Sequence, residues 1–89
     1  MDVPFSALVF QEGDSVVGYS PELDLSSCGA TADEARQNLR AAVRAFVQQA
    51  KEMGTLEEVL TECGYVRGTS EEWLGPKMVA LESMHTLAE

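Results

Sequence analysis

The sequence predicts one α+β domain spanning residues 1–89, with a three- to four-stranded antiparallel sheet and one long helix packed across it. Three observations lead to this fold class. At 89 residues the chain is long enough for one domain and too short for two. Short β-branched and aromatic runs within residues 5–28 are separated by turn residues. A longer stretch, residues 31–54, carries apolar side chains at helical spacing.

Two strands are expected at residues 5–10 and 15–20. Alternation along the first run leaves both of its sides largely apolar. The polar, glycine-containing stretch 11–14 favours a hairpin turn between the two strands. Pro21 ends the second strand because proline has no backbone N–H to donate. Residues 26–28 are a short candidate third strand.

The helix is the clearest element in the sequence. Thr31 and Glu34 match a capping box, which predicts that the helix begins at Thr31. Gly54 is suited to end it. One stripe of the helix is apolar and consists of Ala35, Leu39, Ala42, Val43, Phe46, Ala50 and Met53. The opposite face holds four basic residues, which we interpret as a solvated exterior: Arg36, Arg40, Arg44 and Lys51.

The second half of the chain is less regular. Residues 55–58 repeat the capping-box pattern and predict a helix of about two turns. Residues 65–76 are expected to form a loop or an irregular strand. Residues 78–87 fit both alternation and helical spacing, and the β-branched content favours a strand. The core of the domain is therefore expected over about 3–64, with a strand-like C-terminal segment over about 77–88.

The charge is the least ordinary feature of the composition. The chain contains six Lys and Arg residues and 15 Asp and Glu residues, which gives a net charge of −9. A domain this acidic repels phosphate backbones, so we expect no direct nucleic-acid binding by this chain. It is suited instead to a basic protein partner.

Compartment and membrane association follow from what the chain lacks. The longest apolar run, residues 7–10, is far too short to span a bilayer, so no membrane association is expected. Residues 1–4 are neither basic nor followed by a long apolar stretch, so no secretory signal is expected. The protein is accordingly expected to be cytoplasmic. Cys28 and Cys63 are expected to remain reduced and to act as small apolar residues.

Most catalytic arrangements require residues that this sequence does not supply. His85 is the one histidine, so an acid–base or cysteine mechanism has a single candidate base. Cys28, Cys63 and His85 are too few and too widely spaced for a typical zinc site. No glycine-rich phosphate loop is present. We therefore expect no enzymatic activity, no catalytic residues, no metal and no cofactor.

One acidic cluster remains as a candidate site. The stretch after the second strand contains an aromatic ring, an apolar side chain and two carboxylates, supplied by Tyr19, Glu22, Leu23 and Asp24. It is either an ordinary polar crossover or a contact surface for a basic protein.

This part of the chain resembles the HicB-like antitoxin family. That family's motif runs from a Tyr-x-x-x-Pro-Glu-Leu strand end to a Gly-x-Thr-x-x-Glu-Ala helix start. The resemblance covers about the first fifty residues, and the connection over residues 24–28 is slightly longer than in the family. One residue, not the three of the motif, separates the Tyr and Pro positions here. The corresponding positions are Tyr19, Pro21, Glu22, Leu23, Gly29, Thr31, Glu34 and Ala35.

The resemblance implies a partial ribonuclease H-like fold without the catalytic acids. It also implies that the chain binds and neutralises a small basic HicA-like RNA-cleaving toxin. Many members of the family carry a C-terminal DNA-binding element, and residues 65–89 show no pattern of that kind.

The alternative function is a stand-alone oligomeric domain that binds a small molecule and has no toxin partner. An ordered ligand beside Trp73 or Tyr19 would favour it. In either case we expect a homodimer or higher homo-oligomer, because a small sheet leaves an open edge. Its interface is expected to include Val79, Leu81 and Leu87.

Overall fold

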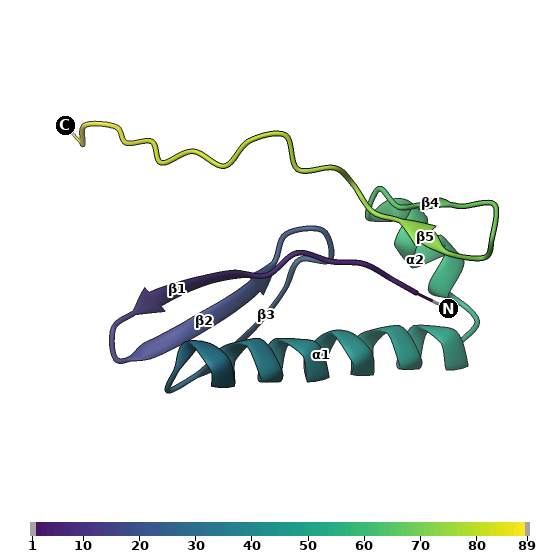
Figure 1. Ribbon diagram of the computed structural model, residues 1–89, viewed down its shortest axis with the longest axis horizontal. Helices are drawn as coiled ribbons and strands as arrows, with labels where there is room; N and C mark the ends of the chain where they lie inside the picture. Colours follow the sequence, from purple (N-terminus) through teal and green to yellow (C-terminus); the bar gives the residue numbers. More distant parts are fainter. Residues whose placement is uncertain (1, 89) are drawn as a thin grey trace.

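The computed structural model describes residues 2–88 and confirms the α+β fold class. Strands β1 (Leu8–Glu12), β2 (Ser15–Ser20) and β3 (Leu25–Gly29) form an antiparallel sheet in the order β1-β2-β3. Helix α1 (Ala32–Glu52) packs across this sheet, as Figure 1 shows. Both hairpin connections are short, so sequential strands are also neighbours in space.

The second half of the chain forms a small unit at the end of α1. Helix α2 (Leu56–Glu62) is followed by a hairpin of β4 (Val66–Arg67) and β5 (Trp73–Leu74). The predicted second helix is confirmed, and the stretch expected as a loop or irregular strand contains this hairpin. The second capping box does not form. The Thr55 hydroxyl donates instead to the carbonyl of Ala50, the last turn of α1 (3.4 Å).

The β1–β2 hairpin explains where the first strand ends. Glu12 pairs with Ser15, so the turn consists of two residues. Gly13 has a φ of 63°, a conformation that glycine adopts without steric cost. The strand begins at Leu8 rather than at Phe5, because the preceding residues run unpaired beside α1.

The predicted start of α1 is confirmed in detail. The Thr31 hydroxyl accepts a hydrogen bond from the backbone N–H of Glu34 (3.1 Å). The Glu34 carboxylate in turn accepts one from the backbone N–H of Ala30 (3.2 Å). Two N–H groups at the helix start, which have no partner within the helix, are thereby satisfied.

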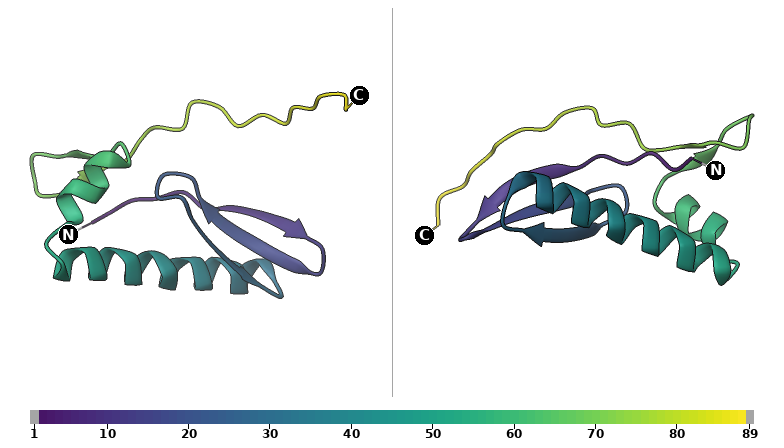
Figure 2. Two further views of the ribbon diagram at one scale, coloured as in Figure 1. Left: turned by 180° about the vertical axis from the view of Figure 1, so that it is seen from behind. Right: turned by 60° about the horizontal axis from the view of Figure 1, so that its bottom comes forward.

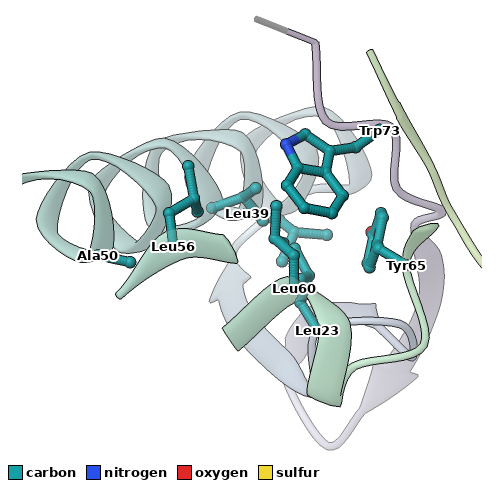
Figure 3. Close-up of a cluster of buried hydrophobic side chains, with 8 residues drawn as sticks. Leu23, Leu39, Ala50, Leu56, Leu60, Tyr65 and Trp73 are labelled. Atoms are coloured by element: carbon teal, nitrogen blue, oxygen red, sulfur yellow. The ribbon is translucent and has the colours of Figure 1, made fainter. Parts of the chain in front are cut away.

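Close contact between α1 and the sheet depends on small residues. A Cβ at Gly18 of β2 would lie 3.1 Å from the carbonyl oxygen of Ala35. The core then extends along α1 to its far end, where α2 and the β4–β5 hairpin close over it (Figure 3). Its buried members are Leu23, Leu39, Val43, Ala50, Leu56, Leu60, Tyr65 and Trp73.

The other face of the sheet has no helix on it. Gly18 faces α1, so its neighbours Val17 and Tyr19 point to the opposite side. The register places the cross-strand partners of these two residues on that same side. We call this surface the open sheet face and define it by Leu8, Phe10, Val17, Tyr19 and Cys28. The apolar second side expected for the first strand is therefore real, and α1 does not cover it.

The strand expected over residues 77–88 is wrong for the single chain. Within the described residues this segment, the C-terminal tail, is extended but pairs with no strand, and every residue in it is exposed. Figures 1 and 2 show it leaving the β4–β5 hairpin and passing the sheet on the side away from α1. An extended segment becomes a strand only when another strand accepts its backbone hydrogen bonds. No helix within residues 2–88 has the length and apolarity that a membrane crossing requires.

Candidate functional site

The acidic stretch forms a tight loop at one end of the sheet. Residues 21–24 connect β2 to β3, and Ser20 pairs with Leu25 at the base of the loop. Asp24 has a φ of 53°, in the left-handed region. Among non-glycine residues, aspartate and asparagine adopt this conformation most readily. The sequence therefore suits a sharp reversal at this position.

Glu22 fastens the loop to the N-terminal segment. Its Oε1 atom accepts hydrogen bonds from the backbone N–H of Ser6 (2.9 Å) and from the hydroxyl of Ser20 (3.2 Å). Partial burial tends to raise the pKa of this carboxyl. The hydrogen bonds from Ser6, Ser20 and the backbone outweigh burial, and the pKa is lowered overall. Glu22 is thus an ionised, half-buried anchor rather than a free surface charge.

Tyr19 and Asp24 form the outer part of the loop. The phenol of Tyr19 donates a hydrogen bond to Asp24 Oδ1 (2.9 Å). This hydrogen bond, followed by burial and the negative charge of Asp24, raises the pKa of Tyr19. Tyr19 is half-buried and Asp24 is exposed. The pair presents one carboxylate and the edge of one aromatic ring to solvent.

Leu23 was expected to contact a partner, and that prediction is wrong. Its side chain is only 5% exposed and belongs to the hydrophobic core. The turn at Asp24 and the anchoring of Glu22 direct the intervening side chain inward, as Figure 3 shows. The structure therefore brings Tyr19, Glu22 and Asp24 together at the loop, whereas the side chain of Leu23 is part of the hydrophobic core.

Two neighbours of this loop were not identified from the sequence. Ser6 holds Glu22 through its backbone N–H, a role that any residue type except proline could fill, so no residue-type signal marks it. The start of the C-terminal tail also lies beside the loop. A hollow of about 500 Å³ between them is lined by Pro21, Glu22, Pro76, Lys77, Met78, Val79 and Ala80.

The residues considered for catalysis are not brought together. Cys28 lies exposed on the sheet, Cys63 is half-buried after α2, and His85 is exposed in the C-terminal tail. The described residues, 2–88, contain no cluster of three or more His, Cys, Asp or Glu side chains that could hold a metal ion.

The region beside Trp73 offers little room for a ligand. The indole is 4% exposed, and the guanidinium of Arg67 lies 5.3 Å from its ring centroid. Arg67 also forms an ion pair with Glu57 (3.2 Å). The adjoining hollow measures about 230 Å³. Small-molecule sites are usually larger, at about 300–1,000 Å³.

The basic face of α1 borders a groove that the sequence did not predict. Arg36 pairs with Asp33 on the same helix (2.7 Å). Arg40 lies further along α1 and lines a groove between the helix and the N-terminal segment, beside Val3 and Phe5. The face was expected to be a solvated exterior, and it is exposed, but it also forms one wall of this groove.

The chain was compared with protein-family models, with curated proteins and with solved structures, and none of the three comparisons gives a match.

Proposed function

We propose that this chain is an antitoxin-like interaction module that binds and neutralises a small basic HicA-like RNA-cleaving toxin. The proposed contact is the loop between β2 and β3, with Tyr19 and Asp24 as its partner-facing residues and Glu22 as the residue that anchors the loop. The role is binding without catalysis, and the proposed setting is the cytoplasm.

The observation that carries the proposal is a carboxylate held at the surface by a rigid loop. Asp24 is exposed, its backbone turn is fixed, and its side chain is oriented by the hydrogen bond from Tyr19. An ionised carboxylate has lone pairs beyond the one that this bond uses. It can therefore also accept a hydrogen bond from an arginine or lysine of a partner.

Rigidity and overall charge both favour such a contact. Glu22 ties the loop to Ser6 and Ser20, so little further ordering is needed when a partner binds. The net charge of −9 attracts a basic protein at long range and raises the rate of encounter.

The test is a binding measurement with the product of the neighbouring gene, which the proposal requires to be a small basic protein. Asp24→Lys should weaken binding by about tenfold or more, because a buried charge pair is replaced by a repulsion. Asp14→Lys is the matched control. It makes the same charge change on an exposed residue of the β1–β2 turn, which is a different loop.

Binding that both variants weaken equally would show attraction by net charge alone and would refute the assignment of the loop. If the purified full chain does not bind the neighbouring protein at all, the antitoxin proposal itself is refuted.

A further inference from the structure

Two apolar surfaces of this chain lie exposed on the same side of the molecule. One is the open sheet face, where Phe10 is 46% exposed although it lies at the centre of a strand. The other is the C-terminal tail. Its large apolar side chains are exposed by 46–93% and belong to Met78, Val79, Leu81, Met84 and Leu87.

The extended tail makes the molecule less compact than a domain of this length. Its Cα radius of gyration is 15.1 Å. A compact domain of this length has a value of about 12 Å. The sheet lies between α1 and the tail in Figures 1 and 2. Exposed apolar surfaces of this kind mark an interface rather than a solvated surface.

We propose that the C-terminal tail of one copy packs across the open sheet face of a second copy, and that the second copy's tail does the same in return. The result is a two-fold homodimer in which both chains contribute the same two surfaces. Alternation places Val79, Leu81 and Leu87 on one side of the extended tail, so these side chains face the partner's sheet.

A second copy fits better than the chain's own tail. The tail passes its own sheet while Met84 and Leu87 remain 84% and 88% exposed. A tail that belonged on its own sheet would bury these side chains there. The start of the tail lies beside the β2–β3 loop, because Pro76 and Lys77 line the same hollow as Pro21 and Glu22.

The area available reaches the lower part of the range for specific interfaces. Burying a Val or Leu side chain removes about 60–120 Å² from water. The three side chains that face the partner, Val79, Leu81 and Leu87, therefore bury about 180–360 Å² in one tail, and the face that they cover buries a similar area. Both tails together give a total of about 700–1,400 Å², against about 1,200–2,000 Å² in typical specific interfaces.

The chemistry of the open sheet face also suits this occupant. Its centre consists of Phe10, Val17 and Cys28, which are cross-strand neighbours without a charge. This centre offers a basic toxin no counter-charge, whereas the apolar side chains of Val79, Leu81 and Leu87 can be buried against it. The dimer does not depend on the antitoxin role, because the purified chain alone should form it.

Cross-linking between two different copies tests the arrangement. Both copies carry Cys63→Ser. The first keeps Cys28, and the second carries Cys28→Ser with Val79→Cys. A short thiol-to-thiol bismaleimide should join them into a covalent heterodimer of about twice the 9.7 kDa chain mass. Thr69→Cys, in the exposed loop between β4 and β5, replaces Val79→Cys as the matched control and should give no heterodimer.

Sedimentation equilibrium at micromolar concentration supplies the second measurement. The full chain should be a dimer, and Leu81→Glu should weaken dimerisation by at least about tenfold. Thr69→Glu should have no effect. A monomeric full chain would overturn the proposal, and so would a dimer that Leu81→Glu does not weaken.

The last outcome to test is the tail folding back on its own sheet. A single chain that carries both Cys28 and Val79→Cys would then cross-link within itself and run as a monomer. That result, with no heterodimer in the mixed sample, would also overturn the proposal. Binding of a toxin is measured separately, so failure of the dimer leaves the proposed function to its own test.

Discussion

Replacing Tyr65 by phenylalanine removes one long-range hydrogen bond and leaves the packing of the ring intact. Tyr65 is 1% exposed, and its hydroxyl donates to the carbonyl of Pro4 at 2.6 Å. The N-terminal segment is also held by a backbone bond from Trp73 to Asp2 (3.2 Å). These two bonds fasten the start of the chain to the unit formed by α2 and the β4–β5 hairpin.

The expected cost follows from the surroundings of the two atoms. A net hydrogen bond contributes about 0.5–1.5 kcal/mol, and an unsatisfied buried carbonyl adds about 1–3 kcal/mol. Pro4 is exposed, so water can replace the lost donor, and the phenyl ring leaves no cavity. Tyr65→Phe should therefore lower the free energy of unfolding by about 1 kcal/mol and Tm by about 4–8 °C.

Urea denaturation near pH 7 measures this difference. Burial, and then electrostatic interactions with Glu22 and Cys63, raise the pKa of Tyr65 to about 12, so the hydroxyl keeps its proton in the assay. Tyr19→Phe is the matched control, because it removes a hydroxyl that bonds only the exposed Asp24. A Tyr65→Phe protein as stable as the wild type, or less affected than Tyr19→Phe, would refute the reasoning.

Three further predictions concern the sheet-to-helix connection and the loop. Thr31→Ala should cost about 1 kcal/mol in chemical denaturation, and no change would mean that the observed cap adds nothing. Gly29→Ala should cost about 1–3 kcal/mol, because its Cβ would lie 2.9 Å from the backbone nitrogen of Ala35; an unchanged midpoint would contradict that contact. Glu22 has a folded pKa below its usual 4.5, so its ionised form stabilises the fold above that pH, and this contribution is lost as the pH falls through the lowered pKa. Glu22→Gln should therefore be less stable than the wild type near pH 7 and approach it in acid; a pH-independent difference would show that the charge is not responsible.

Local signals in the sequence were sufficient for the elements that depend on local physics. The cap at Thr31, the turn at Gly13 and the apolar stripe of α1 all involve residues within a few positions of one another. Their hydrogen bonds and packing directions can be worked out from spacing alone. The β4–β5 hairpin was harder, because strands of two residues are too short to show a period.

The loop between β2 and β3 could be predicted only in part from the sequence. Leu23 stands between two acids after a proline, and its neighbours in sequence predict exposure. Leu23 is nevertheless buried, in a loop that is anchored by the hydrogen bond from the backbone N–H of Ser6, 16 residues before Glu22. A hydrogen bond from a backbone N–H does not depend on residue type, so the sequence does not reveal it. The separate roles of Glu22 as anchor, Leu23 as core residue and Asp24 as surface residue therefore became visible only in the structure.

The first strand and the C-terminal tail both have apolar side chains that the single chain leaves exposed. A strand with apolar residues on both sides predicts a sheet that is covered on both faces. Helix α1 covers one face, and no described element covers the other. The tail has the apolar alternation of a strand. In the single chain, however, its described backbone pairs with no strand and its apolar side chains remain exposed. The open sheet face lacks a cover, and the C-terminal tail lacks a surface to pack on. In the dimer that we propose, the alternation at Val79 and Leu81 is that of a segment packed on the sheet of a second copy.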